Sequence, residues 1–197
     1  MMKQLSEKLT QFVIDSGVIS KESYAVYQYG FQIGLEMLSC LMACSVIAVY
    51  LRMIPEFIAL TVFFMLLRSF AGGVHLNSFW KCFICSVTVQ TLVLVLNDLH
   101  RFSIRNAWGI IILSSILIFK LAPVQSINRE LDNDEKEHGK SAVMRILSVL
   151  LLFSGCCTLI SNNKMVSLMA FIVLTILISQ CVGVVKYKIE KDISGRK

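Results

Sequence analysis

Long apolar runs alternate with short polar segments along most of this 197-residue chain. A run of about twenty apolar residues crosses the hydrocarbon core of a bilayer as a helix. The six runs cover about residues 31–51, 57–67, 79–96, 108–121, 142–160 and 165–185. The second run is short for a full crossing unless residues 54–71 all contribute. The pattern therefore predicts an all-α, polytopic membrane protein with about six transmembrane helices.

A different pattern precedes the first run. Apolar residues recur at helical spacing among charged ones at Leu5, Leu9, Phe12 and Val13. This spacing predicts an amphipathic helix within residues 1–17, ending near Gly17. Two placements are open: the helix lies in the membrane interface, or it packs against the rest of the protein. Because residues 20–29 are polar and rich in tyrosine, we expect residues 1–29 to form an interfacial N-terminal region.

Composition agrees with one membrane-embedded domain over residues 1–197. The chain is 56% hydrophobic and 16% charged, which is far from the composition of a soluble domain. With two prolines and ten glycines, it shows neither low complexity nor repeats. The domain is expected to contain one sizeable polar loop at 122–141 and a basic tail at 186–197.

The basic residues predict how the chain is oriented. With six spans, both termini lie on one side, and fifteen of the nineteen basic residues fall there. Only four fall on the opposite side: Arg52, Arg101, Arg105 and Lys164. The positive-inside rule then places both termini, and the segment around residues 75–82, in the cytoplasm. The formal charge of +6 is thus an orientation signal, and no nucleic-acid-binding module accompanies it.

The seven cysteines do not form the pattern of a disulfide framework. Five lie inside apolar runs, where a free cysteine acts as a small hydrophobic residue: Cys40, Cys44, Cys156, Cys157 and Cys181. Cys82 and Cys85 form a Cys-x-x-Cys, but no second pair with zinc spacing and no thioredoxin-like context exists. We therefore expect no metal site and no cofactor. No secretory signal peptide is evident either, because the first thirty residues lack a continuous apolar core.

Candidate chemistry is concentrated in residues 68–85. His75 and Cys82 are the minimum set for thiol nucleophilic catalysis. On a continuous helix, seven residues would separate the two side chains by roughly 10 Å, which is too far for a hydrogen bond. If the two residues act together, His75 must lie in non-helical backbone that folds back over the helix carrying Cys82, and Gly72-Gly73 supplies the break. The alternative is an ordinary membrane loop with an incidental histidine and apolar cysteines.

The residues of two segments resemble the accessory gene regulator B (AgrB) family, membrane cysteine endopeptidases of Gram-positive quorum sensing. The first segment contains Arg68, Gly72-Gly73-x-His75, Ser78-Phe79-Trp80 and Cys82. The second contains Ala122-Pro123-Val124, Asn128-Arg129 and Leu131. Length and hydropathy fit the family along essentially the whole chain. The departures, Lys81 before the cysteine and Leu76-Asn77 after the histidine, leave the His-to-Cys spacing intact.

The resemblance implies a reaction and a partner. Cys82 would be the nucleophile and His75 the general base in cleaving an AgrD-like precursor peptide on the C-terminal side of its future signal sequence. An acyl-enzyme would then promote closure of a thiolactone or lactone ring. The family also implies location in the bacterial cell membrane and assembly as a homodimer.

Supporting roles follow in the same way. Arg68 and Gly73 are candidates to support the pair, Arg68 by binding a substrate carboxylate and Gly73 by leaving space near the histidine. Four residues remain open as the group that orients the imidazole or stabilises the oxyanion: Asn77, Ser78, Asn97 and Asp98. Candidate substrate contacts are Glu36 in the first span and the cations Lys81, Lys120 and Arg129.

Other hypotheses remain open beside the peptidase. A peptide exporter without covalent chemistry would also use six spans and an intramembrane carboxylate. A scaffold for another membrane enzyme would be indifferent to His75 and Cys82. Within the peptidase hypothesis, Cys85 is the rival nucleophile. His138 is expected to be solvated in its charged loop, and His100 is expected on the side opposite Cys82.

Overall fold

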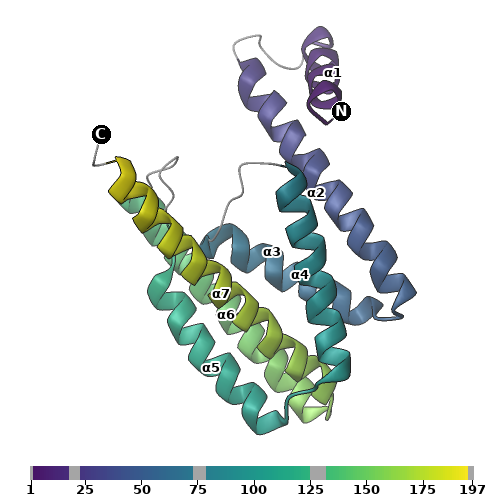
Figure 1. Ribbon diagram of the computed structural model, residues 1–197, viewed down its shortest axis with the longest axis vertical. Helices are drawn as coiled ribbons and strands as arrows, with labels where there is room; N and C mark the ends of the chain where they lie inside the picture. Colours follow the sequence, from purple (N-terminus) through teal and green to yellow (C-terminus); the bar gives the residue numbers. More distant parts are fainter. Residues whose placement is uncertain (1, 18–22, 73–78, 125–131, 195–197) are drawn as a thin grey trace.

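The computed structural model describes residues 2–17, 23–72, 79–124 and 132–194, and within these ranges all regular secondary structure is helical. Seven helices are present there (Figure 1): α1 Met2–Asp15, α2 Tyr24–Tyr50, α3 Ile54–Ala71, α4 Phe79–Leu99, α5 Ile104–Leu121, α6 Asn133–Leu159 and α7 Asn163–Ser194. The six helices α2 to α7 are long and apolar enough to cross a membrane. The predicted all-α fold with about six transmembrane helices is confirmed.

At one end of the bundle, the helices are joined by short connections. The turns from α2 to α3 and from α6 to α7 each pass through a residue of positive φ, Arg52 and Ser161. Pro55 lies in the first turn of α3, where the missing N–H removes no helical hydrogen bond. With 18 residues, α3 is about 27 Å long, close to the thickness of the hydrocarbon core, and it is long and apolar enough to cross a membrane. Residues 54–71 therefore all contribute to the second span.

Successive helices from α2 to α7 run in opposite directions, so their connections lie at two ends of the bundle. We call one the Lys164 end, where the α2–α3, α4–α5 and α6–α7 connections lie. The other is the Cys82 end, where α3, α5 and α7 finish and α4 and α6 begin.

Helix α7 lies at the centre of the bundle. It packs against α3, α4, α5 and α6 (Figure 1). Four large apolar side chains along it are fully buried: Leu168, Met169, Ile172 and Ile176. By contrast, α2 packs against α1, α3 and α4 and exposes apolar side chains along most of its length. Such exposure suits a helix whose outer faces contact lipid.

A charge network joins three helices at the Lys164 end. Lys164 Nζ, at the start of α7, lies 2.8 Å from the Glu56 carboxylate of α3 and 3.6 Å from Asp98 of α4. The Asn97 side chain donates a hydrogen bond of 3.2 Å to the Lys164 carbonyl. Glu56 is buried, and Lys164 is the cation that pairs with it there.

The N-terminal helix combines the two placements that the sequence left open. Helix α1 contacts α2, and its buried side is Ser6, Thr10 and Ile14. The apolar stripe Leu5, Leu9 and Phe12 remains exposed. The helix is thus packed on the protein and still offers an apolar face of the kind that inserts into a membrane interface.

Three helices extend beyond the predicted spans, and this corrects the predicted boundaries. Helix α2 begins at Tyr24, α6 begins at Asn133 inside the predicted 122–141 loop, and α7 continues through the predicted tail to Ser194. Hydropathy detects only the part of a helix that lies in lipid, because a helix can continue into water with polar side chains. In α6, Asp134 and Glu135 occupy the first turn, where acidic residues are favoured by the helix dipole.

Candidate functional site

The candidate nucleophile lies in the first turn of α4. Cys82 is exposed there, and Cys85 follows one turn later, also exposed. Neither thiol is in a disulfide bond. The beginning of α4 lies beside α2 (Figure 1). An exposed thiol at the start of a helix is accessible to a substrate.

Arg68 lies across the α3–α4 connection from both thiols. It occupies the last turn of α3, is half-buried, and is within electrostatic range of Cys82 and Cys85. The exposed Lys81 adds a second positive charge at the position before Cys82. Two cations from separate helices are therefore available near the start of α4.

The two sequence segments that carry the family resemblance meet at the end of α3. The Ala71 carbonyl accepts a hydrogen bond of 3.0 Å from the Val124 backbone N–H. Gly72 follows with φ 76°, and a Cβ there would lie 2.8 Å from the Val124 carbonyl oxygen. Only glycine fits this combination of left-handed backbone and close backbone approach. The first Gly of the Gly-Gly pair is thus required by its contact with the second segment.

Replacing Gly72 with alanine is expected to lower the unfolding free energy by about 2 kcal/mol, because the Cβ adds left-handed strain and a backbone clash. Thermal unfolding in detergent should show a melting temperature lower by about 5 °C. Gly34→Ala is the matched control, since a Cβ at Gly34 in α2 meets nothing within 4 Å. Equal melting temperatures for the two variants would contradict the close approach.

Several predicted site residues lie outside the described residues. They are His75, the supporting Gly73, Asn77 and Ser78, and the candidate substrate contact Arg129. The structure describes the residues on either side of the segment that contains Gly73, His75, Asn77 and Ser78. They are Gly72, which follows α3, and Phe79, which begins α4.

The other candidate substrate contacts fall on two helices. Lys120 is exposed in the last turn of α5, at the Cys82 end. Glu36 is half-buried in α2, and its Oε1 accepts a hydrogen bond of 3.1 Å from the Gln32 side chain one turn earlier. Glu36 therefore has a partner within its own helix.

Two of the four candidates for the third catalytic group lie at the wrong end. Asn97 follows Cys82 by fifteen residues of continuous helix, which is about 22 Å. Asn97 and Asp98 instead contact Lys164 at the opposite end of the bundle. Both therefore lie too far from Cys82 to orient an imidazole or stabilise an oxyanion there, so Asn77 and Ser78 stay open as candidates. His100 also lies at the Lys164 end, as predicted.

Gln180 lies at the Cys82 end and is not among the residues that the sequence predicted for the site. Gln180 of α7 is fully buried, and its Nε2 donates a hydrogen bond of 3.1 Å to the Ala71 carbonyl. A glutamine inside an apolar span is itself a signal, because polar side chains in lipid are costly and face protein. Its partner is 109 residues away and could not be read from the sequence.

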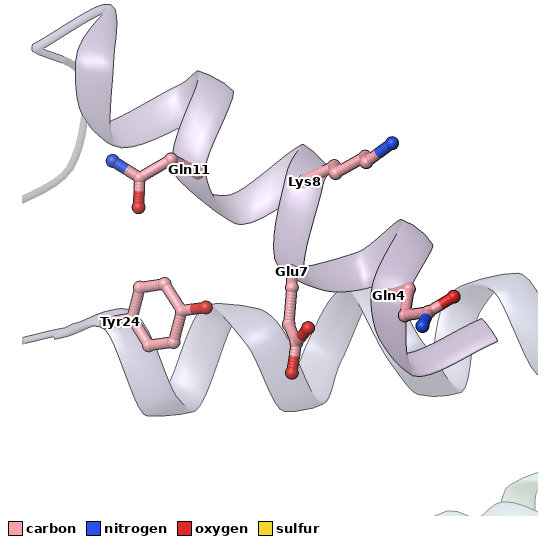
Figure 2. A pocket seen from close by; sticks show the side chains of 5 residues that line it. All are labelled: Gln4, Glu7, Lys8, Gln11 and Tyr24. Atoms are coloured by element: carbon pink, nitrogen blue, oxygen red, sulfur yellow. The ribbon is translucent and has the colours of Figure 1, made fainter. Parts of the chain in front are cut away.

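A polar groove opens between the first two helices. It is lined by Gln4, Glu7, Lys8 and Gln11 of α1 and by Tyr24 of α2 (Figure 2). None of these is a predicted site residue, and the mixture of charges selects no ligand. In the part of the chain that the structure describes, no three His, Cys, Asp or Glu side chains gather as a metal site.

Comparison with known proteins decides the family. The family model of accessory gene regulator B matches residues 6–183. The chain belongs to the AgrB family. A Clostridium beijerinckii protein named "Putative AgrB-like protein" is 25% identical over 154 residues, covering 77% of this chain and 74% of that protein. A Clostridium perfringens strain SM101 protein of the same name is 21% identical over 193 residues, covering 92% and 90%. No solved structure matches the chain.

Membership of the AgrB family confirms the resemblance seen in the sequence. It indicates a multi-pass membrane protein involved in processing a quorum-sensing peptide, with an AgrD-like pro-peptide as substrate. The match covers α2 to α6 completely and most of α7. Both resemblance segments and Gln180 therefore lie within the family region.

Proposed function

We propose that this chain is a membrane cysteine endopeptidase that cleaves an AgrD-like precursor on the C-terminal side of the future signal sequence. The observation that carries the proposal is the exposed Cys82 at the start of α4, within electrostatic range of Arg68 of α3. Both lie at the end of the bundle where Ala71-Gly72 and Val124 meet. An accessible thiol next to a cation is the arrangement that thiol nucleophiles use.

His75 is the general base in this proposal. It takes the proton from the Cys82 thiol, and the thiolate attacks the scissile carbonyl carbon. Gly72 turns the chain out of the α3 direction three residues before His75, so the intervening chain need not continue α3. Arg68 and Lys81 stabilise negative charge at the thiolate and at the developing oxyanion. Gly73, Asn77 and Ser78 support the pair.

Cleavage proceeds through an acyl-enzyme. As the C–N bond breaks, His75 returns the proton to the leaving amine, and the C-terminal part of the precursor departs. A thioester remains between Cys82 Sγ and the new carboxyl-terminal carbonyl. A nucleophilic side chain of the bound peptide then attacks this carbonyl, His75 accepts its proton, and the Cys82 thiolate leaves. Holding that side chain close lets ring closure compete with hydrolysis.

The remaining assignments complete the proposal. Lys81, Lys120 and Arg129 contact the precursor, and Glu36 contacts it where α2 passes the beginning of α4. Residues 1–197 act as one peptidase domain, with the termini and the Cys82 end in the cytoplasm, since most basic residues lie on that side. The chain acts as a homodimer. Exposed apolar side chains along α2 are compatible with lipid or with a second copy.

The proposal is tested by co-expressing the chain with an AgrD-like precursor that carries a tag at each end. We expect the wild-type chain to release the C-terminal tag and to form an adduct at Cys82 that hydroxylamine removes, both read by gel and mass spectrometry. His75→Ala should slow release by about 100-fold or more, because it removes the general base.

His138→Ala is the matched control, since His138 is an exposed histidine of α6 and should leave release unchanged. If the precursor stays intact while it crosses the membrane, the chain is an exporter without covalent catalysis. Release that is unaffected by His75→Ala would contradict the proposed base.

A further inference from the structure

One backbone carbonyl joins three parts of the chain at the Cys82 end. Ala71 is the last residue of α3, so its carbonyl has no helical partner four residues later. It accepts hydrogen bonds from the Val124 N–H at 3.0 Å and from the Gln180 side chain at 3.1 Å. The end of α3 is thereby fixed to the segment after α5 and to the central helix α7.

The side chain that makes this bond is unusual for its position. Gln180 has no exposed surface and lies within the membrane-spanning part of α7, between apolar turns. Among the described residues, its Oε1 has no hydrogen-bond partner. A buried, half-satisfied amide is costly to keep in a lipid-embedded helix. An apolar side chain would pack there at lower cost unless the hydrogen bond to Ala71 has a role.

Chain connectivity suggests that role. Ala71 and Gly72 form one attachment of the stretch that contains His75, and α4 with Cys82 forms the other. A shift at the end of α3 therefore displaces one attachment relative to the nucleophile. A misplacement of about 1 Å between catalytic groups is enough to cost about 100-fold in rate.

We propose that Gln180 is a positioning residue, whose hydrogen bond to the Ala71 carbonyl holds the end of α3 where His75 can reach Cys82. It does not touch the precursor and acts through Ala71. This inference rests on the proposed His75–Cys82 pair and adds a residue of α7 to the machinery.

The test measures the reactivity of Cys82 in the full chain, in detergent, without a precursor. Iodoacetamide is the probe, and mass spectrometry follows alkylation of Cys82 and Cys85 within the same protein between pH 5 and pH 9. Cys85, exposed one turn later on α4, is an internal standard. In the wild-type chain, a thiolate paired with His75 should make Cys82 react about tenfold faster than Cys85 at pH 6.

Gln180→Leu keeps the approximate volume and removes the hydrogen bond, and we expect the Cys82:Cys85 ratio at pH 6 to fall to about one. Gln180→Glu should restore much of the ratio, because a neutral carboxyl group can donate to the Ala71 carbonyl. Gln90→Leu is the matched control: Gln90 is another buried glutamine in a spanning helix, and its loss should leave the ratio unchanged.

If Gln180 only stabilised the fold, the result would differ. Gln180→Leu would then lower the amount of folded protein without changing how the alkylation of Cys82 in that protein depends on pH. A wild-type profile in Gln180→Leu, or an equal loss in Gln90→Leu, overturns the inference. If Gln180→Leu does not fold, the Gln180→Glu profile decides, since its restored ratio supports the role and a ratio of about one contradicts it.

His75→Ala separates the inference from the proposed function. If His75→Ala leaves the wild-type profile unchanged, the catalytic pair itself fails. If His75→Ala abolishes the fast reaction at pH 6 while Gln180→Leu retains it, the pair stands and only the role of Gln180 is lost.

Discussion

Replacing Cys82 with alanine is expected to reduce cleavage of an AgrD-like precursor by at least about a thousandfold, to the detection limit of a gel assay. The thiol supplies the only bond to the peptide in the proposed acyl-enzyme, so no other group can substitute for it. Release of the C-terminal fragment, measured by mass spectrometry in cells that express both chains, checks the result. Because Cys82 is exposed, its replacement leaves no cavity and should not change the melting temperature.

Cys85→Ala is the matched control for that experiment. Cys85 is exposed, lies one turn further along α4, and is also within electrostatic range of Arg68. We expect Cys85→Ala to retain at least about half of the cleavage, since the paired base serves Cys82. The reverse outcome, cleavage that survives Cys82→Ala and disappears in Cys85→Ala, would assign the nucleophile to Cys85. Cleavage in both variants would rule out the thiol mechanism.

The number of spans was predictable because the thickness of a bilayer sets the length of a helix that crosses it. Each apolar run had to be about twenty residues long, and the doubtful second run could be extended only to residues 54–71, which α3 occupies. Helical structure outside the lipid was not predictable in this way. Residues 133–141 are polar, and polar residues form loops and solvated helices equally well, so the start of α6 had no hydropathy signal.

The proximity of Arg68 and Cys82 was predictable because both lie in one short stretch, and the α3–α4 connection leaves Arg68 within electrostatic range of Cys82. Their roles stay predictions. Asn97 was a candidate by residue type alone, and fifteen residues of helix separate it from Cys82. Gln180 could not be assigned a partner, because its contact with Ala71 depends on how α7 packs on α3. Tertiary packing of this kind leaves no local pattern.

Replacing Lys164 with methionine is expected to lower the unfolding free energy by about 3 kcal/mol, because it leaves the buried Glu56 carboxylate without its cation. The two groups lie 2.8 Å apart, and their side chains are 25% and 11% exposed. Thermal or denaturant unfolding in detergent measures the change. Arg101→Met is the matched control: its pair with Asp98 is 3.6 Å long and about half exposed, so its loss should cost less than about 0.5 kcal/mol.

The double variant Glu56→Gln with Lys164→Met should recover most of the loss, because it removes both charges together. A double variant as unstable as Lys164→Met alone would show that Lys164 stabilises the bundle by packing. Asp98, which also contacts Lys164, lies about 24 Å along α4 from Cys82, so precursor cleavage per folded molecule should be unchanged. The two ends of the bundle are then separable by experiment: Cys82→Ala removes chemistry and leaves stability, and Lys164→Met does the reverse.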